Sequence, residues 1–467
     1  MTATTHQGGT FAKRVTAVFS TKLFAFSMSF ATSIVVSRIL GTDGKGQYVA
    51  VIAVPALLGG IGVFGLPNAI NYFSARGISV RGLLRAGLLF TTILSAVLMT
   101  VLWVLLPWLH GSILSGAPVD TLRIGLITVP AALLSTFGSA VLYGRQQIRT
   151  YSTILVAQAF TTFTLAVLFV GVFRWGVLGA VAASIIVTWL LAIAVVVAVA
   201  RLSGRTSEGG PVSYRALMRY GSRIYPSSIT GYFNYRVDVF IIQALMVGQS
   251  GQLGLYSMAV TMAELLFYVP DSVTMIFLPR VSGSTPAEAD ALMPRVARLT
   301  VLITCLCAVA LIPAAYVGIH LVLPTFAPCL PAFLVLLPGV VSIALAKVMT
   351  SYIAGRGRPG PVSAGATVAL FINVVANLIL IPQFGIVGAA MASLISYSAL
   401  AVMMVVVACR LSNLSPLTIV VPGKAEVRLL WSAAGRAVAS LRARLAGRGR
   451  GAAANGAAGG IDSGTPS

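Results

Sequence analysis

The sequence predicts an all-α, polytopic membrane protein in which twelve transmembrane helices form two pseudo-symmetric six-helix bundles around a central cavity. Three observations support this prediction: the composition, a series of long apolar segments, and an internal repeat. Of the 467 residues, 58% are hydrophobic and 9% are charged, whereas soluble proteins contain about 45–50% apolar and about 25% charged residues. So few charged side chains cannot cover a soluble protein of this length, which excludes a cytosolic enzyme, a disulfide scaffold and a disordered protein.

Twelve segments are long and apolar enough to cross a membrane, which requires about 20 mostly apolar residues. The first has no small-residue cleavage site after a short apolar core, so it is predicted to be a retained helix and not a signal peptide. The segments are 15–38, 47–73, 83–107, 122–143, 151–173, 176–200, 224–247, 253–278, 299–323, 331–354, 361–382 and 386–409.

The basic residues predict the orientation. With a cytoplasmic N-terminus, 25 of the 32 Lys and Arg residues lie on the cytoplasmic side, as expected for membrane proteins, whose cytoplasmic loops are rich in Lys and Arg. The same bias accounts for the net charge of +22, because these residues face anionic lipid headgroups. No nucleic-acid partner is needed, and both termini are predicted to be cytoplasmic. The outer side holds four basic residues: Arg38, Lys45, Arg123 and Arg174.

The two halves of the chain resemble each other at an offset of 208 to 211 residues. Six helices in each half would give both halves the same topology and relate them by a two-fold axis along the membrane normal. Transporters with such parallel repeats bind substrate between the halves. The matching pairs are Gly46-Gln47-Tyr48 with Gly254-Leu255-Tyr256, Pro130 with Pro338, Tyr143-Gly144-Arg145 with Ala354-Gly355-Arg356, and the segment 176–180 with 385–389.

The repeat divides the chain into an N-terminal bundle, 1–200, a cytoplasmic linker, 201–223, and a C-terminal bundle, 224–411. The remaining residues, 412–467, form a basic tail. Within it, 424–446 has the pattern of an amphipathic helix on the inner membrane surface, with a solvated basic tail as the alternative. The Gly- and Ala-rich residues after 447 are expected to be disordered.

Six charged residues fall inside the predicted spans, where a charge is costly unless it faces a cavity or a partner. The three cations would form a path from the cytoplasm to the bilayer centre that suits a diphosphate, since Arg offers a planar fork of donors and Lys a point charge. Alternatively, Arg236 pairs with Glu264 and the lysines reach the headgroups. The six are Lys22, Arg236, Lys347, Asp238, Glu264 and Asp271.

Other candidate residues follow from spacing. Glu264 and Asp271 are seven residues apart on one predicted helix face and, with Asp238, would form ion pairs or bind a coupling proton or Na⁺. Asn373 and Asn377 are four apart and would hydrogen-bond sugar hydroxyls or a neighbouring helix. No catalytic or metal-binding pattern is found; the cysteines are interpreted as small buried hydrophobic residues.

Several short motifs resemble those of a known family, the oligosaccharide-lipid flippases of bacterial polysaccharide export. The resemblance covers roughly residues 11–411. This family belongs to a superfamily that also contains the MATE multidrug/cation antiporters and the lipid II flippase. The motifs are Ser37-Arg38-Ile39-Leu40-Gly41, Gly44-Lys45-Gly46-Gln47-Tyr48, Gly65-Leu66-Pro67-Asn68-Ala69, Arg236-Val237-Asp238, Gly254-Leu255-Tyr256 and Leu278-Pro279-Arg280.

The resemblance implies a MATE-like fold and a flippase, not an enzyme. It implies export of a polyprenyl-diphosphate-linked oligosaccharide across the bacterial cytoplasmic membrane by alternating access. No cofactor is expected; a proton or Na⁺ gradient or the membrane potential would supply energy. The expected partners are membrane lipids, the glycan substrate and, as an open question, other polysaccharide-assembly membrane proteins. The main alternative is a multidrug or cation antiporter with Asp238 or Glu264 as its ion site. The short outer loops disfavour a glycosyltransferase or polymerase.

Overall fold

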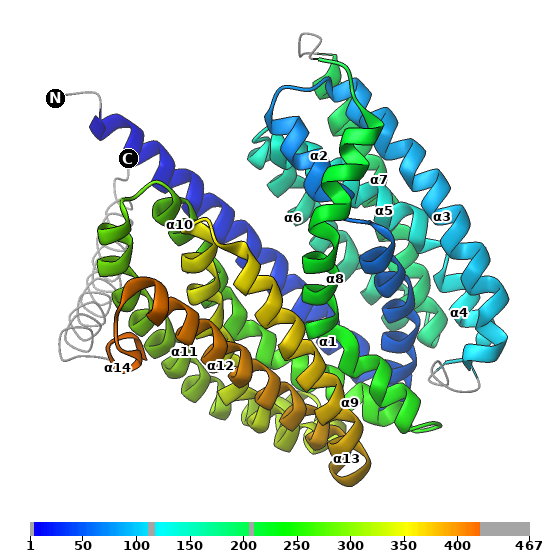
Figure 1. The fold of residues 1–467 in the computed structure, drawn as a ribbon. Helices are drawn as coiled ribbons and strands as arrows, with labels where there is room; N and C mark the ends of the chain where they lie inside the picture. Colours follow the sequence, from blue (N-terminus) through cyan, green and yellow to red (C-terminus); the bar gives the residue numbers. More distant parts are fainter. Residues whose placement is uncertain (1–3, 111–116, 205–209, 421–467) are drawn as a thin grey trace, which may run out of the picture.

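The computed structural model describes the backbone of residues 4–110, 117–204 and 210–420. Side chains are described in the same ranges, except for residues 4–23, 109–110, 148, 227–228 and 235. All regular elements in this part of the chain are helical (Figure 1). The predicted tail helix 424–446 and the end of the chain after 447 lie outside the described residues.

The N-terminal half contains the first seven α-helices. They are α1 (Thr4–Gly62), α2 (Leu66–Ala75), α3 (Val80–His110), α4 (Val119–Gly125), α5 (Thr128–Gly144), α6 (Ile148–Ala166), which continues into a π-helical turn η1 (Val167–Val172), and α7 (Gly176–Ser203).

The C-terminal half contains the other seven. They are α8 (Tyr214–Leu245), α9 (Ser250–Glu264), the 3₁₀ turn η2 (Leu265–Phe267), α10 (Tyr268–Ser282), α11 (Pro286–Val322), the 3₁₀ segment η3 (Pro324–Cys329), α12 (Leu330–Gly355), α13 (Pro359–Ser412) and α14 (Pro416–Val420).

Nine helical segments of the described chain are long and apolar enough to cross a membrane. Two of them, in α1 and α13, each cover two predicted spans. Between these spans a glycine with positive φ interrupts the helix: Gly41 with φ 67° in α1 and Gly385 with φ 57° in α13. The helix α8, which covers the predicted span 224–247, is not among the nine. A multi-pass membrane protein is therefore supported, while the count of twelve stays a prediction.

The helices form two groups that meet at an angle (Figure 1). One group contains α2 to α7 and the other α9 to α13. The helix α1 packs against α6 and α7 of the first group and against α9 of the second, and α8 packs against both α2 and α13. Thus α1 and α8 join the two groups. The division at 200 and 224 stays a prediction.

The repeat is visible in the backbone. Gly176 and Gly385, which the offset of 209 relates, both have positive φ, 61° and 57°, a conformation that favours glycine. Three residues later, a Cβ at Gly179 would lie 2.9 Å from the carbonyl oxygen of Phe169, and one at Gly388 would overlap that of Leu380. In both matched segments the first glycine is favoured by its positive φ, and the second is required because a carbonyl oxygen lies where a Cβ would be.

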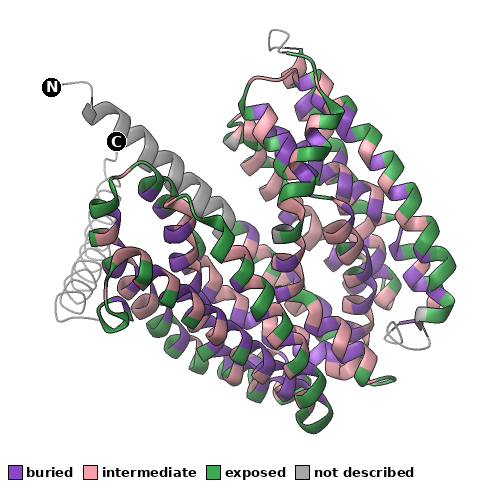
Figure 2. Ribbon diagram, in the orientation of Figure 1, coloured by how far each residue is buried: buried purple, intermediate pink, exposed green. Residues whose placement is uncertain are grey.

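Buried and exposed residues are distributed as in a membrane protein. Buried residues lie on the helix faces that pack together (Figure 2). Large apolar side chains are strongly exposed on the other faces, including Leu321 at 76%, Trp108 at 74% and Phe371 at 70%. A soluble protein rarely exposes so much contiguous apolar surface, so these faces are suited to contact lipid chains.

Candidate functional site

Four of the charged side chains predicted inside the membrane form two ion pairs. The Nη2 atom of Arg236 on α8 lies 3.7 Å from Oε1 of Glu264, the last residue of α9. The Nζ atom of Lys347 on α12 lies 2.6 Å from Oδ1 of Asp271 in the first turn of α10. The Arg236 side chain is 50% exposed and that of Asp271 is 53% exposed. The cluster therefore borders open space.

The two carboxylates do not continue one uninterrupted helix face. The 3₁₀ turn Leu265–Phe267 separates α9 from α10. A spacing of seven residues therefore does not place Glu264 and Asp271 on one face of a continuous helix. Glu264 pairs with α8 and Asp271 with α12. Lys347 also lies 4.5 Å above the ring of Phe267, which belongs to this 3₁₀ turn. The two ion pairs on either side of the turn, called the charged cluster below, thus link α9 and α10 to α8 and α12.

Asp238 has a different environment, although it is only two residues from Arg236. Its side chain is buried, with 8% exposure. One carboxylate oxygen accepts the backbone N–H of Val239 at 2.9 Å, and the other accepts the hydroxyl of Tyr256 on α9. A cation or proton could reach this carboxylate only after a rearrangement.

The two asparagines of α13 bond to each other. Asn377 Nδ2 donates to both the backbone oxygen and Oδ1 of Asn373, each at 2.9 Å. Both residues are buried, at 1% and 0% exposure. In this conformation they do not border open space, so a contact with sugar hydroxyls stays a prediction. The side chain of Lys22 lies outside the described residues, so the cationic path can be followed only from Arg236 to Lys347.

Lys45 is buried, which the sequence did not predict. The charge bias places it in a loop on the outer side, but α1 continues through this position and Lys45 is buried, with 5% exposure. Its Nζ donates to Oγ of Ser33 at 2.9 Å and lies 5.9 Å from the ring centroid of Tyr48. No local pattern signals this burial, because Gly44 and Gly46 on either side of Lys45 are typical of a loop.

A cavity of about 390 Å³ lies in the N-terminal half, among α2, α5, α6 and α7. Amide, hydroxyl and phenol groups line much of it, and none of its lining residues is charged. The rings of Tyr143 and Tyr151 lie 4.5 Å apart there. Sequence reasoning missed this cavity because it followed charged residues. The lining polar residues are Asn68, Asn71, Ser135, Thr136, Ser139, Tyr143 and Tyr151.

No group of three or more His, Cys, Asp or Glu side chains in this part could hold a metal ion. The candidate site has two parts: a charged cluster in the C-terminal half and an uncharged polar cavity in the N-terminal half.

The fold is that of the transporters of the MOP superfamily. Among solved structures, the lipid II flippase MurJ in an inward closed conformation aligns with a TM-score of 0.71 at 12% identity, covering 83% of this chain and 87% of MurJ. An inward-facing multidrug resistance MATE family transporter aligns with a TM-score of 0.62 at 16% identity, covering 83% and 94%.

A third solved structure has the same fold. It is a MOP superfamily transporter from Pyrococcus furiosus, whose binding pocket is described as having reverse polarity. It aligns with a TM-score of 0.53 at 16% identity, covering 86% of this chain and 96% of that one. No protein-family profile matches the sequence, and no curated protein matches it. At these identities the likeness shows the fold alone.

Proposed function

We propose that this protein is a membrane transporter that moves a polyprenyl-diphosphate-linked oligosaccharide across the bacterial cytoplasmic membrane by alternating access, with both termini inside. The fold supports transport, because its structural neighbours are transporters and one of them, MurJ, is a flippase of a lipid-linked molecule. The short motifs quoted above support a glycan precursor as the substrate. No enzyme activity is proposed.

The observation that carries the proposal is the state of Arg236. Its distance of 3.7 Å to Glu264 is longer than a charge-assisted hydrogen bond, about 2.7–2.9 Å. Half of its side chain is exposed. The guanidinium of Arg236 is therefore held near Glu264 by a loose ion pair and remains accessible to a ligand. It can offer paired N–H donors to diphosphate oxygens. Lys347 would act as a second cation after its tight pair with Asp271, at 2.6 Å, has opened.

The cavity in the N-terminal half suits the other part of such a substrate. Sugars expose hydroxyl groups that both donate and accept hydrogen bonds, and the cavity offers the same kinds of group from Asn68, Asn71 and Ser139. Aromatic residues such as Tyr143 and Tyr151 add apolar surface for the sugar rings. A substrate between the halves would thus place its charge toward α8 and its glycan toward α2 and α5.

One observation favours a second function, a multidrug or cation antiporter. Asp238 is a buried carboxylate that is hydrogen-bonded to Tyr256, and it could carry a proton or Na⁺ in exchange for an organic cation. Intramembrane carboxylates often serve this purpose. The two functions differ in the charge of the transported molecule, so one experiment separates them.

The purified protein is reconstituted into vesicles with a polyprenyl-diphosphate-linked oligosaccharide that carries a fluorophore on the glycan. A membrane-impermeant quencher reports how much glycan lies on the outer face. In parallel, uptake of a fluorescent organic cation is measured under a proton or Na⁺ gradient. We expect glycan movement and no gradient-driven cation uptake. The opposite pattern would assign the antiporter function.

A further inference from the structure

The two halves meet backbone to backbone at the repeated Gly-x-Tyr element. A Cβ at Gly46 on α1 would overlap the carbonyl oxygen of Ser250 and lie 3.1 Å from the amide nitrogen of Gly254. A Cβ at Gly254 on α9 would overlap the carbonyl oxygen of Thr42 and lie 3.0 Å from the amide nitrogen of Gly46. The offset of 208 relates both pairs, so the contact is reciprocal, as at a two-fold axis.

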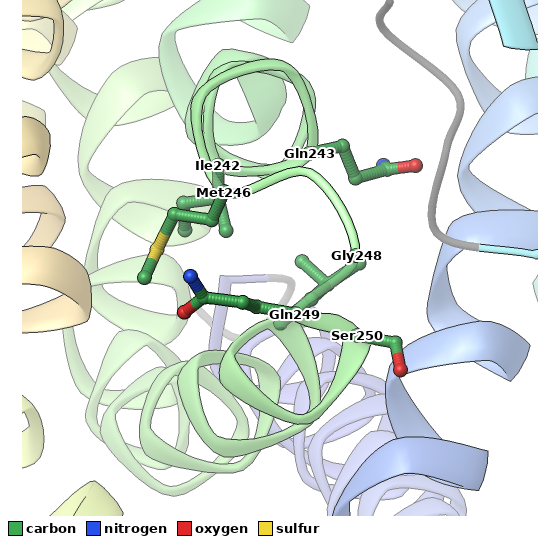
Figure 3. Close-up of a pocket in the computed structure, with 7 residues that line it drawn as sticks. Ile242, Gln243, Met246, Gly248, Gln249 and Ser250 are labelled. Carbon is green, nitrogen blue, oxygen red and sulfur yellow. The ribbon is translucent and has the colours of Figure 1, made fainter. Parts of the chain in front are cut away.

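One side-chain hydrogen bond crosses the same contact. The hydroxyl of Ser250 donates to Oδ1 of Asp43 at 3.2 Å. Figure 3 shows the turn from α8 to α9, where Ser250 points to one side and Met246 and Gln249 to the other. The pocket at this turn has a volume of only about 10 Å³, which is room for one water at most. The turn itself therefore encloses almost no free space.

Each side of the contact is tied to its own half by a tyrosine. Tyr48 shares a hydrogen bond of 2.9 Å with Ser184 on α7. Tyr256, which matches Tyr48, is buried and donates its hydroxyl to Asp238 on α8, which also belongs to the C-terminal half. Gly46 and Gly254 are each two residues before these tyrosines. The two glycine segments would thus move with the halves to which they are attached.

We propose that the Gly46–Gly254 contact is a closed gate at the end of the molecule that the charge bias assigns to the outside, and that the two halves separate here during transport. The proposal rests on alternating access in the proposed function. No long side chains interdigitate at the two glycines themselves, although α1 and α9 pack against each other extensively. The Asp43 side of the hydrogen bond is exposed, so water can replace it at small net cost.

A disulfide across the gate tests whether it opens. Asp43→Cys and Ser250→Cys are combined in a protein whose native cysteines, Cys305, Cys307, Cys329 and Cys409, are replaced. Oxidation should link the halves and abolish glycan movement in the vesicle assay, and reduction should restore it. The control pair is Ser342→Cys with Ser398→Cys, whose hydroxyls are 3.1 Å apart on α12 and α13 of one half; its oxidation should leave transport unchanged. Full transport by the oxidised gate variant, with its disulfide formed, would overturn the proposal.

A second measurement does not depend on the substrate. With Gly46→Ala or Gly254→Ala added, the gate cannot close, so the yield of the disulfide between the cysteines at positions 43 and 250 should fall at least several-fold in membranes. Gly59→Ala is the matched control on α1, because a Cβ there has no atom within 4 Å; its yield should equal the parent's. An unchanged yield in both gate variants would refute the contact, whatever molecule the protein transports.

Discussion

Arg236 and Asp238 are neighbours on α8, but only one of them can meet a ligand in this conformation. Arg236 is half exposed and holds its partner Glu264 loosely, at 3.7 Å. Asp238 is buried and bonded to Tyr256. An arriving anion would therefore meet Arg236 first. The carboxylate two residues away would be reached only when α8 and α9 move relative to each other.

The first prediction concerns a single residue and its substitution, Arg236→Ala. We expect it to abolish glycan movement while the protein still inserts and folds, because the side chain is half exposed and its ion pair is loose. Arg236→Lys should restore part of the activity, since the ammonium keeps the charge and loses the planar pair of donors. The measurement is the vesicle assay, together with size-exclusion chromatography of each variant. Arg215→Ala, an exposed arginine earlier on α8, is the control.

The ion-pair interpretation of Arg236 predicts a different outcome. If Arg236 only neutralises Glu264, then Arg236→Ala leaves an unpaired anion, and the double variant with Glu264→Ala should regain normal transport. A double variant that folds and stays inactive supports substrate contact. Normal export by that double variant would show that Arg236 is structural.

At the residue scale, a charge inside a long apolar segment is what the sequence makes easy to find. It pointed to Arg236, Glu264, Asp271 and Lys347, which the structure joins in two ion pairs; their roles in substrate or ion binding stay predictions. It could not identify the partners of Lys45, because Ser33 is twelve residues away on the other side of the break at Gly41. Burial of a polar group depends on which helices cover it, and no local pattern records that.

At the scale of elements, the broken helices α1 and α13 decide where the chain reverses. Each contains a glycine with positive φ between two predicted spans, Gly41 and Gly385. The sequence predicted these reversals as loops between separate spans. The structure has short breaks instead, because a single glycine in the left-handed region turns the chain without any additional residues. Hydropathy alone does not distinguish the two.

The second prediction tests this role of glycine. Gly385 has φ 57° and ψ −134°, and a Cβ there would have only Met246 Cε nearby, at 3.7 Å. Gly385→Ala should therefore destabilise the protein through backbone strain, by about 1–3 kcal/mol, and not through a clash. The measurement is the thermal unfolding midpoint in detergent. Gly360→Ala, in the first turn of α13 with no atom within 4 Å of its Cβ, should leave the midpoint unchanged or raise it. Equal midpoints for the two variants would contradict the strain argument.

At the scale of the whole molecule, the repeat was predictable because matched glycines and tyrosines stand at a nearly constant offset of 208 to 211 residues. Gly176 and Gly385 share a backbone conformation, and Gly46 and Gly254 meet at one contact. The sequence did not predict that α8 packs on both α2 and α13. That arrangement depends on how the two groups of helices are tilted, which is a property of the conformation and not of either half alone.

The last prediction concerns the orientation of this molecule in the membrane. In a protein without its native cysteines, Asp120→Cys should react with an impermeant thiol reagent added to intact cells, because Asp120 precedes the fourth predicted span on the outer side and its side chain is 89% exposed. Ala287→Cys, at the start of α11, should react only after the cells are permeabilised. The reason is the distribution of 25 of the 32 Lys and Arg residues on one side; translocating them would cost more than retaining them. The reversed labelling pattern would invert the topology and place the Gly46–Gly254 contact at the cytoplasmic end. The gate would then control loading from the cytoplasm instead of release outside.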